Sequence, residues 1–109
     1  MQLYHSTDSQ GVTILNPDLE TMRLLLAELD EAGAEEEEHP DVSLVHDPSG
    51  WSISVYPSGI VTMENLNTKD DPPDYMNGVT REEALELWQE LSRGEIELVR
   101  KRKWIRDEI

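Results

Sequence analysis

Two turn sequences between three β-prone runs constrain the fold of this chain more than any other feature. In residues 47–50, Pro48 and Gly50 occupy positions that a type I turn favours, and Pro-Ser-Gly at 57–59 reverses the chain again. Such close turns favour antiparallel neighbours, so the middle of the chain is predicted to form a three-stranded meander. Its strands are expected at residues 42–46, 51–56 and 60–66.

The middle run of this meander alternates between apolar and polar side chains. Trp51, Ile53 and Val55 fall on one side of an extended strand, and Ser52 and Ser54 fall on the other. This period of two predicts a sheet with one buried face and one wetter face.

A first helix is expected over residues 17–32. Asn16 is suited to the N-cap, Pro17 to the first helical position, and Gly33 to the end of the helix. Between them, apolar residues recur at helical spacing and predict one buried stripe. The stripe consists of Leu19, Met22, Leu25, Leu26 and Leu29.

A second helix is expected over residues 81–93. Thr80 and Glu83 form a capping box, and Val79 is placed to pack on the first turn. The apolar stripe ends before Gly94, which stops the helix. This stripe consists of Ala84, Leu87, Trp88 and Leu91.

These elements predict a single α+β domain over residues 1–109, in which two to three helices pack on one face of a three- to four-stranded antiparallel sheet. The basic tail, residues 95–109, suits either a short helix or a strand, and the helix is favoured because acids begin it and bases follow. Residues 1–10 are either flexible or supply an edge strand at Met1–His5, and residues 12–15 form a further short β-prone run.

Charge narrows the classes of partner. The chain has 24 acidic and 9 basic residues, a net charge of −15. Residues 1–92 hold 20 acids and three bases, a net of −17, whereas residues 93–109 hold four acids and six bases, a net of +2. Such an acidic body repels nucleic acid and anionic membranes, so neither is an expected partner.

Cysteine usage and the first residues bear on location. The chain has no cysteine, which excludes disulfides and every thiolate site. The residues after Met1 include neither a basic leader nor a long apolar run, so we expect no signal peptide, no transmembrane helix and a cytoplasmic protein.

Motifs for chemistry are few. The acidic run Glu35–Glu38 beside His39 does not follow a cation-loop spacing and is interpreted as a solvated connector. Asp70, Asp71 and Asp74 lie around a tandem proline that stiffens their segment. The other histidines, at 5 and 46, are scattered, and no serine elbow or phosphate loop is present. We therefore predict no enzyme, no catalytic residue, no cofactor and no resident metal, and keep a weak divalent-metal site as an alternative.

Two segments are candidates for contact with a partner. Tyr75 and Met76 lie in a long connection, residues 67–78, where they would either cover the core or offer a contact surface. In the tail, a basic run precedes an aromatic residue and would either fold back on the acidic body or meet an acidic partner or a second copy. This run consists of Arg100, Lys101, Arg102, Lys103 and Trp104.

The acidic α+β body and the turn carrying Gly50-Trp51 are similar to those of small immunity proteins of bacterial polymorphic-toxin systems. That resemblance implies a small cytosolic protein that binds and neutralises a toxin, and it assigns no site residue. Leu87-Trp88, followed by a glycine and a terminal tryptophan, equally resembles uncharacterised bacterial proteins, which implies no function. The leading hypothesis is a protein-binding or regulatory module with a basic partner, and a homo-oligomeric structural protein is the other alternative.

Overall fold

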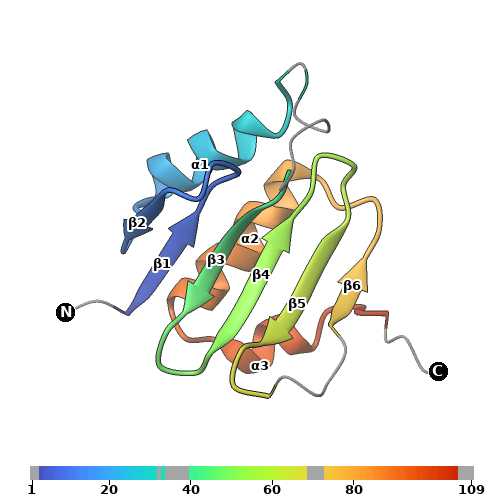
Figure 1. Cartoon of the computed structure of the whole chain (residues 1–109). Coiled ribbons are helices and arrows are strands. Elements are labelled where there is room, and N and C mark those ends of the chain that lie inside the picture. Colours follow the sequence, from blue (N-terminus) through green and yellow to red (C-terminus); the bar gives the residue numbers. More distant parts are fainter. Residues whose placement is uncertain (1–2, 32, 34–39, 69–72, 106–109) are drawn as a thin grey trace.

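All the strands of the described chain belong to one antiparallel sheet (Figure 1). In the computed structural model, which describes residues 3–31, 33, 40–68 and 73–105, the strand order is β2-β1-β3-β4-β5-β6. The strands are β1 (Tyr4–Thr7), β2 (Thr13–Leu15), β3 (Val42–His46), β4 (Trp51–Val55), β5 (Val61–Asn65) and β6 (Asp74–Met76). The helices are α1 (Leu19–Glu28), α2 (Arg81–Ser92) and α3 (Ile96–Arg100).

The predicted meander forms the centre of this sheet. Strands β3, β4 and β5 follow one another in space, so that Leu44 lies beside Ile53 and Ile53 beside Met63. All three side chains are buried, and the serines on either side of Ile53 point to the opposite face. The antiparallel meander and its buried face are confirmed.

The sheet is wider than the three to four strands predicted. Strand β1 was expected at an edge, but it lies between β2 and β3, and β2 is the edge strand. Strand β6 lies inside the connection that the sequence marked only as a loop, with Met76 opposite Val61. Three-residue strands such as β2 and β6 carry too few alternating positions to be recognised from periodicity, which explains the error.

Helix α2 covers the centre of one sheet face, and its predicted stripe is buried. The side chain of Trp88 is inaccessible to solvent, and its indole Nε1–H donates to the carbonyl oxygen of Ile53 at 3.2 Å. The Thr80 hydroxyl accepts a hydrogen bond from the Glu83 backbone N–H, so the N-cap is also where the sequence predicted it. Figure 1 shows α2 and α3 behind the same face of the sheet.

Helix α1 begins two residues later than expected. Asp18, not Asn16, is the N-cap: it accepts from the Thr21 backbone N–H at 2.8 Å, and this bond holds the pKa of Asp18 below its ordinary value. Asn16 has a positive φ of 46°, and its Oδ1 accepts instead from the backbone N–H groups of Leu3 and Tyr4. An asparagine that tolerates the left-handed conformation ends β2 here, so the helix starts after it.

The α1 stripe is buried except at its first position. Met22, Leu25, Leu26 and Leu29 lie in the core, whereas Leu19 is 39% exposed. Because Leu19 is the first residue of the helix, it lies beyond the part of α1 that faces the core.

Ser6 occupies a position that suits an apolar residue. It faces the helices beside Leu44, its relative accessibility is 0%, and its Oγ has no hydrogen-bond partner among the described residues. A desolvated hydroxyl without a partner opposes folding. Ser6→Ala is therefore expected to raise the free energy of unfolding by about 1 kcal/mol, measured by urea denaturation. A decrease of similar size would show that the hydroxyl has a partner that stabilises the fold.

Candidate functional site

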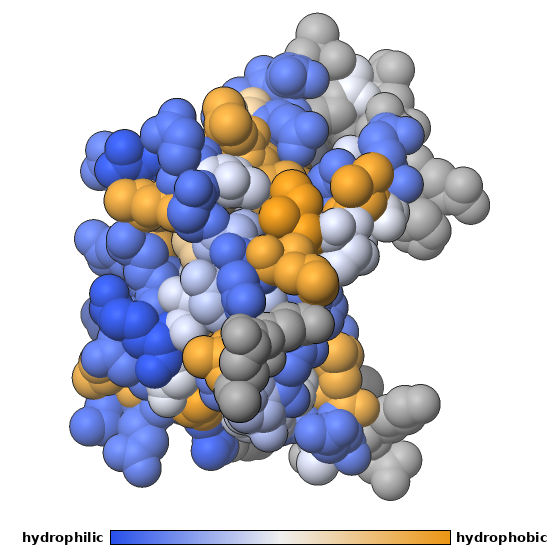
Figure 2. All heavy atoms as spheres, turned by 90° about the vertical axis from the view of Figure 1, so that its left-hand side faces the viewer, coloured by the Kyte–Doolittle hydropathy of each residue, from blue (hydrophilic) through white to orange (hydrophobic). Residues whose placement is uncertain are grey.

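The free edge of the sheet is the first candidate site. Strand β2 pairs only with β1 within the described chain, and every residue of β2 is exposed. Apolar side chains reach the surface on and beside this strand; Figure 2, which views the molecule from this side, shows them (orange) among hydrophilic neighbours. We call these residues the β2 edge patch: Val12 (54% exposed), Ile14 (36%), Leu15 (60%), Leu19 (39%) and Leu24 (61%).

Acidic side chains flank the β2 edge patch. Asp8 sits in the β1–β2 turn, where its Oδ1 accepts from the backbone N–H groups of Gln10 and Val12, each at 2.9 Å. Glu28 lies in the last turn of α1, the negative end of the helix dipole, and no basic residue lies in that turn. Partial burial, followed by the charges of Asp8 and Glu31, raises the pKa of Glu28. This corner of the surface thus holds mutually repelling carboxylates.

The sequence did not point to the β2 edge patch. The short run after Gly11 was recognised as β-prone, but nothing in its residues distinguished an edge strand from an inner one. Leu24 offered the clearer signal, because it falls outside the buried stripe of α1. An apolar residue on the outer face of a surface helix is a reason to look for a contact site.

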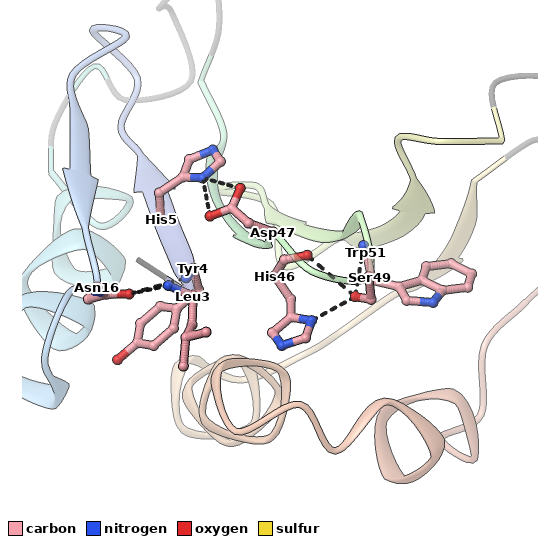
Figure 3. Close-up of polar contacts among 8 residues, drawn as sticks. All are labelled: Leu3, Tyr4, His5, Asn16, His46, Asp47, Ser49 and Trp51. Atoms are coloured by element: carbon pink, nitrogen blue, oxygen red, sulfur yellow. Dashed lines mark hydrogen bonds and ion pairs between the residues drawn. The ribbon is translucent and has the colours of Figure 1, made fainter. Parts of the chain in front are cut away.

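The β3–β4 turn brings two histidines together, although they point to opposite faces (Figure 3). His5 Nδ1 lies 3.0 Å from Asp47 Oδ1 on the helix-free face. On the helix side, His46 Nδ1 lies 2.7 Å from Ser49 Oγ, which also accepts from the Trp51 backbone N–H at 3.3 Å.

The His46–Ser49 distance would suit a nucleophile and its base, but the rest of a hydrolytic site is not built around it. In the described part of the chain, His46 has no carboxylate partner to orient its ring. Its Nε2 side is closed by Gly94, where an added Cβ would lie 3.4 Å from the ring nitrogen. The pair joins residues i and i+3 of a tight turn, so its evident effect is to hold that turn.

The basic tail folds back on the acidic body. Helix α3 ends at Arg100, whose guanidinium lies 5.3 Å from the centroid of the Trp51 ring. Arg102 donates to Glu90 Oε2 at 2.8 Å, and Trp104 Nε1–H donates to the Val99 carbonyl at 2.7 Å. The tail begins with the short helix that the sequence favoured, and a single β-bridge to β6 follows it.

That bridge joins the two segments predicted to contact a partner. The backbone N–H and C=O groups of Tyr75 and Ile105 exchange two hydrogen bonds, at 3.0 and 2.7 Å. Met76 is buried in the core and Tyr75 is half-buried, so these residues help to cover the sheet. Arg100, Lys101 and Lys103 are exposed, and the two lysines take part in no ion pair among the described residues.

A shallow groove of about 240 Å³ runs between α1 and α2. Its floor is apolar, and its rim carries two arginines and two acids, so its charges balance. Arg81 is already engaged there, donating to Asp30 Oδ1 and to the carbonyl oxygens of Tyr56 and Pro57. The groove is lined by Arg23, Leu26, Ala27, Asp30, Arg81, Glu82 and Leu85.

The predicted acidic candidates lie mostly outside the described residues. Glu35–Glu38, His39, Asp70 and Asp71 are not described, and Asp74 is half-buried in β6. Across the residues that the structure does describe, no three acidic or histidine side chains gather as a metal site would require. Within the same ranges, no helix has the length and apolarity needed to cross a bilayer.

Comparison with known proteins adds no relative: the chain matches no protein-family model, no curated protein and no solved structure.

The Arg102–Glu90 pair allows a test of how the tail is held. Glu90 is only 16% exposed, and its Oε1 has no partner among the described residues, so removing Arg102 leaves a poorly solvated carboxylate. Arg102→Met is expected to lower the free energy of unfolding by about 1–2 kcal/mol in urea denaturation. Lys103→Met is the matched control, expected to change it by less than about 0.5 kcal/mol. Equal effects would mean that the pair does not hold the tail.

The raised pKa of Glu28 predicts a pH-dependent gain in stability. The folded state binds this proton more tightly than the unfolded state does, so ionised Glu28 weakens the fold above its raised pKa. Glu28→Gln should therefore increase the free energy of unfolding near pH 7 and lose that advantage as the pH falls to about 4. Urea denaturation at both pH values measures this, with the exposed Glu64→Gln as control. A gain that does not change with pH would contradict it.

Proposed function

We propose that this chain is a protein-binding module whose acidic surface engages a basic protein. One observation carries the proposal: three of the seven described lysines and arginines are ion-paired with the chain's own acids, and most of the described acids have no ion-pair partner. Arg81 binds Asp30, Arg93 binds Glu95, and Arg102 binds Glu90 and Glu86.

The remaining acids give the surface its character. Exposed carboxylates on α1, β5, α2 and α3 have no ion-pair partner among the described bases, for example Glu20, Glu64, Glu82 and Glu97. Uncompensated charge of one sign attracts an oppositely charged protein over distances near a Debye length and speeds its association. A basic partner supplies the countercharge that the chain itself lacks.

An inhibitor of the immunity type is the more specific form of this proposal. It rests on the resemblance noted from the sequence, and the acidic surface supports it because an acidic protein can imitate the charge of a nucleic-acid substrate. A neighbouring gene for a nuclease-like toxin, and inhibition of that nuclease by the purified chain, would support this form. A basic partner without toxin activity would contradict the immunity-type form and leave the general proposal in place.

The test of the general proposal begins with the full chain as bait at low and moderate salt. The recovered partner is then purified, and its Kd for the chain is measured across the same salt range. We expect a protein of basic isoelectric point whose affinity falls about tenfold or more as the salt rises, mainly through slower association. Absence of any direct partner, or an affinity that salt does not change, would contradict the proposal.

A double variant of the tail tests whether the acidic surface or the exposed lysines contact the partner. The double substitution Lys101→Gln with Lys103→Gln removes two exposed bases of the tail and leaves its ion pairs intact. Unchanged or tighter binding is expected if the acidic surface is the contact. Loss of binding would instead assign the contact to the tail, which the sequence marked as a candidate contact segment.

A further inference from the structure

The main-chain N–H and C=O groups of β2 point alternately towards β1 and towards the outer edge of the sheet. The Asn16 N–H donates to the Tyr4 carbonyl at 2.8 Å, and the Val12 carbonyl accepts from the Asp8 N–H at 3.1 Å, so residues 12 and 16 face β1. Antiparallel pairing alternates along a strand, which places Ile14 with them and turns the N–H and C=O groups of Thr13 and Leu15 away from β1. The outer edge of β2 therefore presents two donors and two acceptors in strand spacing.

Of the features that usually protect an edge strand, β2 has one, its length of only three residues, and residues 12–15 supply none of the others. Natural edges carry an inward charge, a lysine, a proline or a bulge that discourages another strand from pairing. Residues 12–15 are Val-Thr-Ile-Leu, and they pair with β1 without a bulge at Thr13–Leu15. The opposite edge differs, because β6 is bridged by Ile105 of the tail. An uncovered apolar edge of this kind suits the addition of a strand.

We propose that the β2 edge accepts an extended segment of a basic protein as a further strand of the sheet. The inference rests on the function proposed above and adds to it the place and the mode of binding. Thr13 and Leu15 would exchange main-chain hydrogen bonds with the segment, and the β2 edge patch would bury its apolar side chains.

Charge complementarity selects the chemistry of that segment. Residues 3–31, which contain β1, β2 and α1, hold six acids and one base, Arg23. A segment that carries lysines or arginines together with apolar residues suits both this excess of acids and the apolar side chains of the β2 edge patch. Apolar side chains on the helix side of the segment would meet Ile14, which lies opposite the buried Ser6, whereas Leu15 lies on the other face of the sheet.

A second copy of the chain is the competing occupant. A two-fold pairing would set Ile14 opposite its own counterpart and Thr13 opposite Leu15, which the main chain allows. It would also bring together two surfaces with the same excess of acids, and like charges facing each other oppose association. The observations therefore favour a basic segment over self-pairing.

The experiment uses the full ¹⁵N-labelled chain and a seven-residue peptide in which lysine alternates with valine. We expect the amide signals of Thr13 and Leu15 to shift and their hydrogen exchange to slow by roughly tenfold or more at saturation. A peptide N-methylated at alternate residues keeps charge and apolar surface but cannot pair along its methylated edge, and it should bind at least about tenfold more weakly.

A matched pair of protein variants tests the same edge, this time with the peptide unchanged. Thr13→Pro removes an outward N–H at a position where an edge strand tolerates proline, and Thr13→Val keeps that donor. We expect about tenfold weaker peptide binding for the proline variant and little change for the valine variant, with the rest of the amide spectrum confirming the fold of both.

The outcomes distinguish the two proposals. Shifts that map away from β2, equal binding of the N-methylated peptide, or a dimeric mass that Thr13→Pro returns to monomer would overturn the edge proposal. If Thr13→Pro still binds a basic partner as tightly as the parent chain does, the edge proposal fails and the proposed function stands. If neither the peptide nor any basic protein binds, both fail.

Discussion

The packing of Trp88 against the centre of the sheet is the interaction on which the rest of the structure depends. The indole is fully buried, and its single polar group donates to Ile53 in the middle strand, so α2 is fixed to β4 by both packing and a hydrogen bond. In a chain without phenylalanine, no other described side chain of this size is fully buried. Helix α2 also contacts α1, α3 and β3, so these elements pack around the helix that Trp88 fixes to the sheet.

The sequence predicted the parts of the fold in which local signals and burial agree. The N-cap at Thr80, the stripe around Trp88 and the alternation at Ile53 each specify one structure, and each was found. The prediction was wrong where a contact between residues distant in the sequence determines the local structure. Asn16 is a good N-cap in isolation, but its side chain accepts hydrogen bonds from the backbone N–H groups of Leu3 and Tyr4, at the start of β1. Strand β6 forms by pairing with β5, which lies beside it in the sheet.

The candidate site was less predictable than the fold. Charge pointed to an acidic body and a basic tail, and the tail proved to be occupied largely with its own chain through Glu90, Trp51 and Tyr75. The β2 edge patch could not be predicted, since exposure of Ile14 or Leu15 depends on which strand ends the sheet. Edge position is a property of topology, and short strands leave little trace of it in a sequence.

Two observations together define our view of the protein: an acidic surface short of its own countercharge, and one sheet edge that the described residues leave open. Hydrogen exchange of the free, full-length chain tests this view most directly. It predicts that the amides of Thr13 and Leu15 exchange rapidly while that of Ile14, which faces β1, is protected. Strong protection at Thr13 and Leu15 in the free protein would contradict it, because the edge would then already be covered.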